Sequence, residues 1–490
     1  MVWTQRLIYW ALAVLLLPGA AGLRGPDDDD KRPEGPNPRL KLVTRTVVGE
    51  GSTIRIGSYR VYENRAAEAG RMLELDVVVI PATGPDTKPD PVFFLAGGPG
   101  VAAAQRFRQH LNSWIRRDRD IVLVSQRGTG GSNKLGCSMA ANDDNLQDYL
   151  EPIFQADVFE ACLDQLELTA DLRMYGTPTA MDDLNEIRQA LGYEKINLIG
   201  GSYGTRAALV YMRRHPETVR TAILNGVAPI AFTNPLYHAR GAQEALDTIF
   251  SLCADDPQCS AAFPDLAAKF QIVIDRLSVA PADVTVRHPE TGEDVKLKLS
   301  SGAFADALRV IMYSDNTDVP LLIHRAFEGD YDAIAQRGLR SDRSLRNILS
   351  FGMLLCVTCA EDIDRIDPDS IERETGGTFL GDARVRQQMA VCEFWPRSNL
   401  PVDYGDPVSV DVPVLLLSGT LDPVTPPRWG EEAARHLPNS LHLVVPGTHG
   451  VGGECITSIM QQFLAEGSVQ DLDTSCVEKM RLPPFDLPAD

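Results

Sequence analysis

One short stretch, residues 196–205, constrains the fold of this chain more than any other. Its apolar start, rich in branched residues, predicts a buried strand, and a helical pattern follows it. Between them lies Gly-Gly-Ser-Tyr-Gly, and a Gly-x-Ser-x-Gly turn between strand and helix is typical of a nucleophile elbow. Gly200 and Gly204 have no Cβ, so strand and helix can approach closely. The stretch makes Ser202 a candidate nucleophile; the alternative is a serine that caps the helix.

Strands alternate with helices on both sides of this stretch. We predict buried strands at 91–95, 120–124, 221–225, 412–417 and 440–445, and helices from about 101, at 179–191, up to about 215 and at about 455–465. Such alternation indicates a parallel sheet with helices on both faces. Period-two patterns at 40–48, 53–62 and 72–80 add antiparallel strands. The expected fold class is therefore α/β, with a mostly parallel central sheet and an antiparallel N-terminal edge.

The middle of the chain departs from this rhythm. From 229 to 406 the pattern is mainly helical, with a small hairpin at 283–299. We therefore predict an inserted helical cap at 229–406, between a first part of the sheet domain at 39–228 and a second part at 407–490.

The N-terminus carries the pattern of an export signal. Apolar residues 7–17 follow a lone Arg6 and precede Pro-Gly-Ala-Ala-Gly. This predicts a signal peptide at 1–22, because the run is shorter than the roughly 20 apolar residues of a membrane-spanning helix. An uncleaved anchor is the alternative. The charged stretch 23–38 predicts a disordered linker. We expect a secreted or periplasmic protein with no stable membrane association after cleavage.

Nine cysteines in an exported chain predict disulfide bonds. Proximity along the chain favours the pairs Cys137–Cys162, Cys253–Cys259 and Cys455–Cys476. Cys392 would then take Cys359 or Cys356, which leaves one thiol free. The Cys-x-x-Cys pattern at 356–359 could also be a redox or zinc motif, but it has no second pair and no thioredoxin-like context.

Charge and motifs argue against several classes of partner. The formal net charge is −20, whereas nucleic-acid phosphates favour a basic surface. The chain has no His-Glu-x-x-His motif and no Gly-x-x-x-x-Gly-Lys-Ser/Thr phosphate loop. The Gly-Thr-Gly at 128–130 lacks the third glycine of a dinucleotide fingerprint. We expect no nucleic acid, no metal and no cofactor.

Two further residues follow late strands, where partners for a nucleophilic serine are needed. A serine hydroxyl requires a base, and a histidine base requires an acid on its other ring nitrogen. Asp422 follows the strand at 412–417, and His449 follows the strand at 440–445. Their order after Ser202 favours an acid and a base. The alternatives are a turn or capping aspartate and a structural histidine.

A glycine-rich segment could complete the site. Ala-Gly-Gly-Pro-Gly at 96–100 follows the strand at 91–95, and glycines leave backbone N–H groups unobstructed. We expect the N–H groups of Tyr203 and Gly98 to form an oxyanion hole, with Gly97 as second choice to Gly98. The alternative is a simple turn.

Together these motifs resemble a known family. They are Gly-Gly-Pro-Gly at 97–100, Gln-Arg-Gly-Thr-Gly-Gly-Ser at 126–132, Gly-Gly-Ser-Tyr-Gly-Thr at 200–205, Asp-Pro-Val-Thr-Pro at 422–426 and His-Gly at 449–450. As a set they resemble the proline iminopeptidase and tripeptidyl aminopeptidase group of α/β-hydrolases. Ala96 and Ser125 stand where many proline iminopeptidases have histidine and aspartate. These departures concern the substrate more than hydrolysis itself.

The resemblance implies an exported serine aminopeptidase that releases N-terminal residues or short peptides through an acyl-enzyme. Its substrate would be a peptide with a free N-terminus, whose α-ammonium group calls for carboxylates in the cap. Glu361 and Asp362 are the candidates, with Glu393 next. An ester hydrolase with the same triad and a non-catalytic hydrolase-like binding protein are the alternatives.

Overall fold

The computed structural model describes residues 37–139, 142–314 and 316–488. Its contacts divide the chain into Met1–Gly35 and Pro36–Asp490, and the first unit lies wholly outside the described residues. The expected signal peptide and nearly all of the expected linker also lie there. Within the described ranges, no helix is both long enough and apolar enough to cross a membrane.

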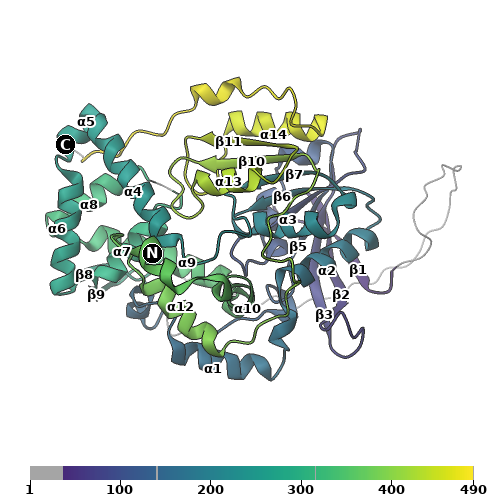
Figure 1. The fold of residues 1–490 in the computed structure, drawn as a ribbon, viewed down its shortest axis with the longest axis horizontal. Coiled ribbons are helices and arrows are strands. Elements are labelled where there is room, and N and C mark those ends of the chain that lie inside the picture. The colour runs from purple at the N-terminus through teal and green to yellow at the C-terminus, as the bar shows by residue number, and fades with distance from the viewer. Residues whose placement is uncertain (1–36, 140–141, 315, 489–490) are drawn as a thin grey trace, which may run out of the picture. The chain divides into compact units, whose positions relative to one another are not determined.

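A nine-stranded sheet forms the centre of the second unit (Figure 1), in the order β1-β2-β3-β5-β4-β6-β7-β10-β11. Its strands are β1 (Leu40–Thr46), β2 (Thr53–Tyr62), β3 (Met72–Ile80), β4 (Val92–Leu95), β5 (Ile121–Val124), β6 (Ile196–Gly201), β7 (Val219–Asn225), β10 (Val414–Gly419) and β11 (Ser440–Val445). The pairs from β1 to β5 are antiparallel, and the pairs from β5 to β11 are parallel. The predicted fold class is confirmed.

The central strands are mostly apolar, and both faces of the sheet are covered. In β6, Leu198 and its neighbour Ile199 belong to two different core clusters. The Leu198 cluster includes α2 (Thr177–Ala190) and α3 (Tyr203–Arg214), and the Ile199 cluster includes α14 (Glu454–Glu466). Successive strand residues point to opposite faces, so a continuous apolar run is what a doubly covered strand requires.

The segment after β4 differs from its prediction. A helix was expected from about 101, but the chain forms the 3-10 helix η1 (Ala103–His110). No side chain at Ala102 caps its first turn, which removes one of the contacts that favour an α-helix start.

A mainly helical region follows β7, as predicted, and Figure 1 shows most of it gathered to one side of the sheet. Its elements are α4 (His238–Asp255), α5 (Pro257–Ala262), α6 (Leu266–Val279), the hairpin β8 (Ala282–Arg287) and β9 (Asp294–Leu299), α7 (Ser301–Ile311), α8 (Val319–Phe327), α9 (Asp332–Ile348), α10 (Phe351–Glu361), α11 (Pro368–Thr375) and α12 (Ala383–Phe394). Elements α4 to α9 share an apolar core of their own. We call the region 229–406 the cap, and its exact boundaries remain a proposal.

Part of the chain before the cap packs against it. The turn η4 (Leu146–Leu150) contributes to the cap core, and Gln147 exchanges hydrogen bonds of 2.9 and 3.1 Å with the backbone of Lys298 in β9. Helix α1 (Ala156–Glu167) packs against α10 and α12. The connection between β5 and α2 therefore supports the cap as well as the sheet.

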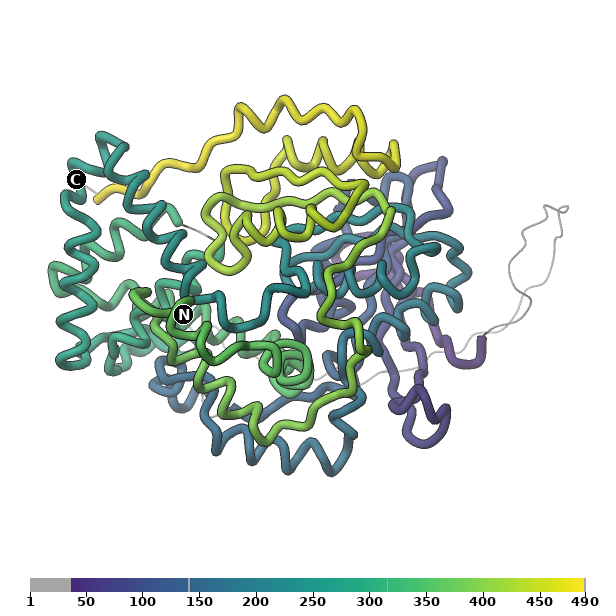
Figure 2. The backbone as a smooth tube through the Cα atoms, in the orientation of Figure 1, coloured from purple at the N-terminus to yellow at the C-terminus, as the bar shows by residue number. Residues whose placement is uncertain are grey.

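The C-terminal segment returns to the cap. After α13 (Pro427–Ala434), β11 and α14, the yellow end of the tube in Figure 2 runs back toward the helices of the cap. There the N–H of Asp486 donates to the carbonyl of Thr317 at 2.9 Å. Leu482 and Phe485 pack against the cap core.

Eight of the nine cysteines form disulfides. The bonds are Cys137–Cys162, Cys253–Cys259, Cys359–Cys392 and Cys455–Cys476. The three pairs expected from proximity are present. Of the two partners considered for Cys392, the structure pairs it with Cys359. The remaining thiol, Cys356, is buried in α10, and burial raises its pKa to about 12.

Titration with a chromogenic thiol reagent tests this arrangement. The native protein should show no reactive thiol, because only the thiolate reacts and Cys356 is both buried and protonated. Denaturation without reductant should expose one thiol per chain, and reduction should expose nine. Cys356→Ala should remove the single thiol of the unreduced chain. More than one thiol before reduction would contradict the four disulfides.

Candidate active site

The candidate nucleophile sits in a strained turn between β6 and α3. Ser202 has φ 55° and ψ −126°, a backbone conformation that is costly for a residue with a side chain. Its N–H donates to the carbonyl of Asn225 at 3.0 Å, which ties the turn to β7. Gly200 and Gly204, which flank the turn, leave no room for a side chain. A Cβ on Gly200 would lie 2.3 Å from the carbonyl oxygen of Gly204, and one on Gly204 would lie 2.1 Å from that of Leu95.

The candidate acid and base contact each other directly. Asp422 lies beyond the end of β10 and is 1% exposed. His449 Nδ1 lies 3.0 and 2.9 Å from the two carboxylate oxygens of Asp422. The carboxylate also accepts the backbone N–H groups of Val424 and Thr425, each at 2.8 Å. Asp422 is therefore held by donors on both oxygens.

These donors decide the charge of Asp422. Burial raises the pKa of the Asp422 carboxyl, but the charge of His449 and hydrogen bonds from His449, Thr425 and Val424 outweigh it and hold that pKa below its usual value. Asp422 is thus ionised at neutral pH. An ionised carboxylate accepts the Nδ1–H of His449, which leaves Nε2 as the ring nitrogen that can take a proton.

Thr425 is a member of this site that the sequence analysis missed. Its hydroxyl donates to Asp422 at 2.8 Å and lies 3.2 Å from His449 Nδ1. It is 1% exposed, so no water competes freely for these contacts. The signal was present in Asp-x-x-Thr, the spacing at which an aspartate turn brings the third residue's N–H and side chain back to the carboxylate.

Ser202 and His449 line the same cavity, which has a volume of about 550 Å³. Asp422 lies behind His449, outside the cavity lining. Among the described residues, the Ser202 hydroxyl makes no hydrogen bond, so it is free to turn toward a base or a substrate. Nucleophile–base hydrogen bonds of unliganded enzymes are often long and tighten when substrate binds.

Free backbone N–H groups surround Ser202. In the described part of the chain, the amides of Tyr203, Gly97 and Gly98 donate no hydrogen bond. Tyr203 begins α3, where helix N–H groups are unpaired and favour negative charge. Gly97 packs against the nucleophile, since a Cβ there would lie 3.2 Å from that of Ser202. All three residues line the cavity, so either glycine can serve as the second donor.

The two carboxylates expected to hold a substrate differ in position. Glu361 does not line the cavity: its oxygens accept from the N–H and hydroxyl of Thr177, at 2.6 and 2.8 Å, and from Tyr404. Asp362 does line the cavity. One of its oxygens accepts from Arg206 at 2.7 Å and lies 3.5 Å from a guanidinium nitrogen of Arg365, and the other is buried with no hydrogen-bond partner.

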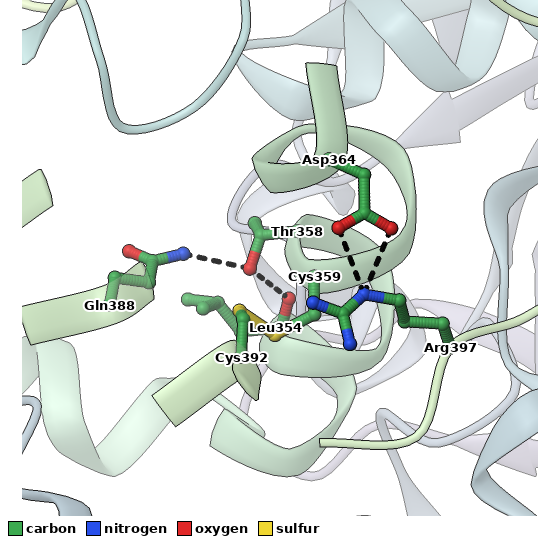
Figure 3. The surroundings of a disulfide bond; sticks show 7 residues. All are labelled: Leu354, Thr358, Cys359, Asp364, Gln388, Cys392 and Arg397. Atoms are coloured by element: carbon green, nitrogen blue, oxygen red, sulfur yellow. Dashed lines mark hydrogen bonds and ion pairs between the residues drawn. A yellow bond between two sulfur atoms is a disulfide. The ribbon is translucent and has the colours of Figure 1, made fainter. Parts of the chain in front are cut away.

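A disulfide fixes the two cap helices that bring charged groups to the cavity. Figure 3 shows Cys359 of α10 joined to Cys392 of α12, with Gln388 of α12 donating to the Thr358 hydroxyl at 2.8 Å. Asp362 follows α10 directly, so its position depends on this link. Glu393, the third candidate, is exposed and does not line the cavity.

Two family models match the chain. A model described as the α/β-hydrolase fold matches residues 90–259, which contain Ser202. A model described as TAP-like protein matches residues 377–476, which contain Asp422 and His449.

Named proteins and a solved structure are also similar to this chain. Serine protease Hip1 of Mycobacterium tuberculosis (strain ATCC 25618 / H37Rv) is 29% identical over 456 residues, covering 83% of this chain and 84% of its own. Proline iminopeptidase of Neisseria gonorrhoeae is 31% identical over 137 residues, covering 28% of this chain and 32% of its own. A crystal structure of proline iminopeptidase from Mycobacterium smegmatis covers 84% of this chain and 98% of its own at 15% identity, with a TM-score of 0.42.

Replacing Thr425 tests its part in this site. Thr425→Val should lower kcat about 10- to 100-fold with little change in KM, because Asp422 loses a hydrogen bond to its charged form and His449 loses alignment. Thr425→Ser keeps the hydroxyl and should retain most of the rate. Steady-state hydrolysis of an activated ester, normalised by active-site titration, measures both. Equal rates for the two variants would contradict the role of the hydroxyl.

Proposed function

Because this chain belongs to the α/β-hydrolase peptidase family of the TAP-like proteins and proline iminopeptidases, we propose that it is an exported serine aminopeptidase. The observation that carries the proposal is the arrangement at the cavity. Ser202, in a strained backbone conformation, and His449, which is hydrogen-bonded to the buried Asp422, line the same cavity. That arrangement supports nucleophilic catalysis, in which the base activates the hydroxyl.

In the proposed reaction, Ser202 attacks the scissile carbonyl and His449 takes the hydroxyl proton at Nε2. Asp422 holds the imidazolium that forms. The oxyanion develops against the N–H groups of Tyr203 and Gly98, and one such donor is typically worth about 3 kcal/mol of barrier. His449 returns the proton to the leaving amine. Water then attacks the acyl-enzyme by the same proton route and releases Ser202.

Asp362 supplies the proposed contact for a free N-terminus. Among the described residues that line the cavity, it is the one carboxylate. Arg206 and, at 3.5 Å, Arg365 both pair with one of its oxygens, and the other oxygen, which has no hydrogen-bond partner, remains for an α-ammonium group. Glu361 has a supporting role in this proposal, because its bonds to Thr177 and Tyr404 fix the end of α10.

Export is proposed from the cysteines together with the N-terminal pattern. The chain has four disulfides. Disulfides form and persist in oxidising compartments and are uncommon in reducing ones. A secreted or periplasmic location fits this chemistry.

A panel of blocked and free substrates tests the proposal. Aminoacyl and tripeptidyl anilides with a free amine should be cleaved at least about tenfold better, in kcat/KM, than their N-acetylated forms, because acetylation removes the charge that meets Asp362. Ser202→Ala should lower kcat by about 10⁴-fold or more on every substrate. A nitrophenyl acetate control reports whether the triad is intact.

The panel also separates the alternatives. Equal cleavage of free and acetylated anilides would contradict the aminopeptidase, and ester cleavage alone would favour an ester hydrolase. An organophosphonate probe that fails to label wild-type protein at Ser202 would favour a non-catalytic binding protein.

A further inference from the structure

Two arginines of the cap line the cavity and have no carboxylate partner among the residues that the structure describes. They are Arg309 on α7 and Arg384 on α12. Arg309 donates to the hydroxyl of Tyr313 at 2.7 Å, and the guanidinium carbon of Arg384 lies 4.0 Å from the ring centroid of Phe154. Among the described residues neither arginine forms an ion pair, and Nε of Arg384 is buried with no hydrogen-bond partner. The two charges are therefore left for another group.

Other buried arginines have an ion pair or several oxygen acceptors. Arg116 and Arg188 form no ion pair among the described residues, but each donates three hydrogen bonds to neutral oxygens. Arg127 pairs with Asp183 at 2.6 Å, and Arg119 pairs with Asp90 at 3.0 Å. Arg309 is buried to a similar degree, at 7% exposed, but its one hydrogen-bond partner is a neutral phenol. A buried charge is costly unless it is paired or well hydrogen-bonded, and Arg309 has fewer acceptors than these other arginines.

Neighbouring acidic residues do not cancel this charge. Burial and the charge of Arg309 lower the pKa of Arg384 to about 10, so both arginines remain protonated at neutral pH. Asp306 and Asp342 act on the pair through space, but Asp342 is bound to Arg346 at 2.6 Å and Asp306 is exposed. Neither aspartate lines the cavity.

Two more polar groups face the same space. His238 is 9% exposed, lines the cavity and has a buried Nδ1 with no hydrogen-bond partner. Burial, reinforced by the two arginines, lowers the pKa of His238 well below its usual value, so it is neutral and can donate one N–H. The Tyr313 hydroxyl is the fourth group of this cluster.

Tyr313 also connects the cluster to the candidate triad. Its carbonyl accepts the N–H of His449 at 3.2 Å, and its ring packs edge-on against the His449 ring with centroids 5.4 Å apart. One tyrosine therefore links Arg309 to His449, so a group bound at Arg309 lies in the same cavity as the candidate triad.

We propose that Arg309, Arg384, His238 and Tyr313 bind a carboxylate of the peptide substrate. The cluster supplies two guanidinium forks, which match carboxylate geometry, and two neutral donors. This inference rests on the proposed peptidase function and adds its substrate class: peptides with a carboxylate near the scissile bond. The carboxylate is either an acidic side chain of the released N-terminal part or the C-terminus of a short leaving peptide.

Wild-type enzyme and two matched substrate series test the proposal. The first series compares glutamate with glutamine at each position of free-amino tripeptidyl anilides, whose leaving group carries no carboxylate. The second compares short neutral peptides that end in a free carboxylate with the same peptides ending in an amide. We expect the carboxylate form to be favoured about 10- to 100-fold in kcat/KM in one series, which identifies its source.

Variants then locate the preference. Arg309→Gln and Arg384→Gln should each reduce the ratio between carboxylate and amide substrates toward one. Arg386→Gln removes a charge from the same helix α12, where exposed Arg386 pairs with Asp382, and should keep the wild-type ratio. Phosphonate titration of Ser202 gives the concentration of folded enzyme, and a ratio of two substrates is independent of it.

Different results would contradict the carboxylate site and the peptidase function on which it rests. Equal rates for carboxylate and amide in both series, with free amines still preferred, would overturn the carboxylate site alone. A preference that survives both arginine substitutions would overturn its location. Failure to cleave any free-amino peptide would overturn the peptidase function and the inference with it.

Discussion

The turn at Ser202 depends on how closely α3 approaches β4 and β6. At Gly200 and Gly204 the backbones lie so near each other that no Cβ fits. This contact holds a serine in a conformation that costs about 1–3 kcal/mol in isolation. The cost is sustained because β6 lies between β4 and β7 in a sheet covered on both faces. The position of the hydroxyl at the cavity is thus a consequence of the packing of the sheet.

The rest of the site comes from parts of the chain far apart in sequence. Asp422 and His449 follow the last two strands of the sheet, and the cap stands between them and Ser202 in the chain. The cap also contacts the site directly, because the Tyr313 carbonyl accepts the N–H of His449. The base is therefore positioned from two sides: Asp422 holds its ring, and the cap holds its backbone. A change in cap packing that moves Tyr313 should therefore also shift the backbone of His449.

Sequence patterns predicted the sheet and its edge because period and turn chemistry are local. They also placed Asp422 and His449 after strands, and the structure brings the two into contact. They did not identify Thr425, Arg309 or Arg384. In α10 every residue is buried, so no face of that helix distinguished a cavity-lining residue from a supporting one. Only tertiary packing separates Asp362, which reaches the cavity, from Glu361, which binds Thr177 and Tyr404 instead.

The C-terminal segment has a practical consequence for work with this protein. It is attached to α14 by the Cys455–Cys476 bond and reaches the cap at Thr317. Some ten residues of tether, at about 3.3 Å each when extended, limit how far those attachment points can separate. A purification tag or fused domain joined to this segment would therefore pull on the cap at Thr317 rather than on the sheet.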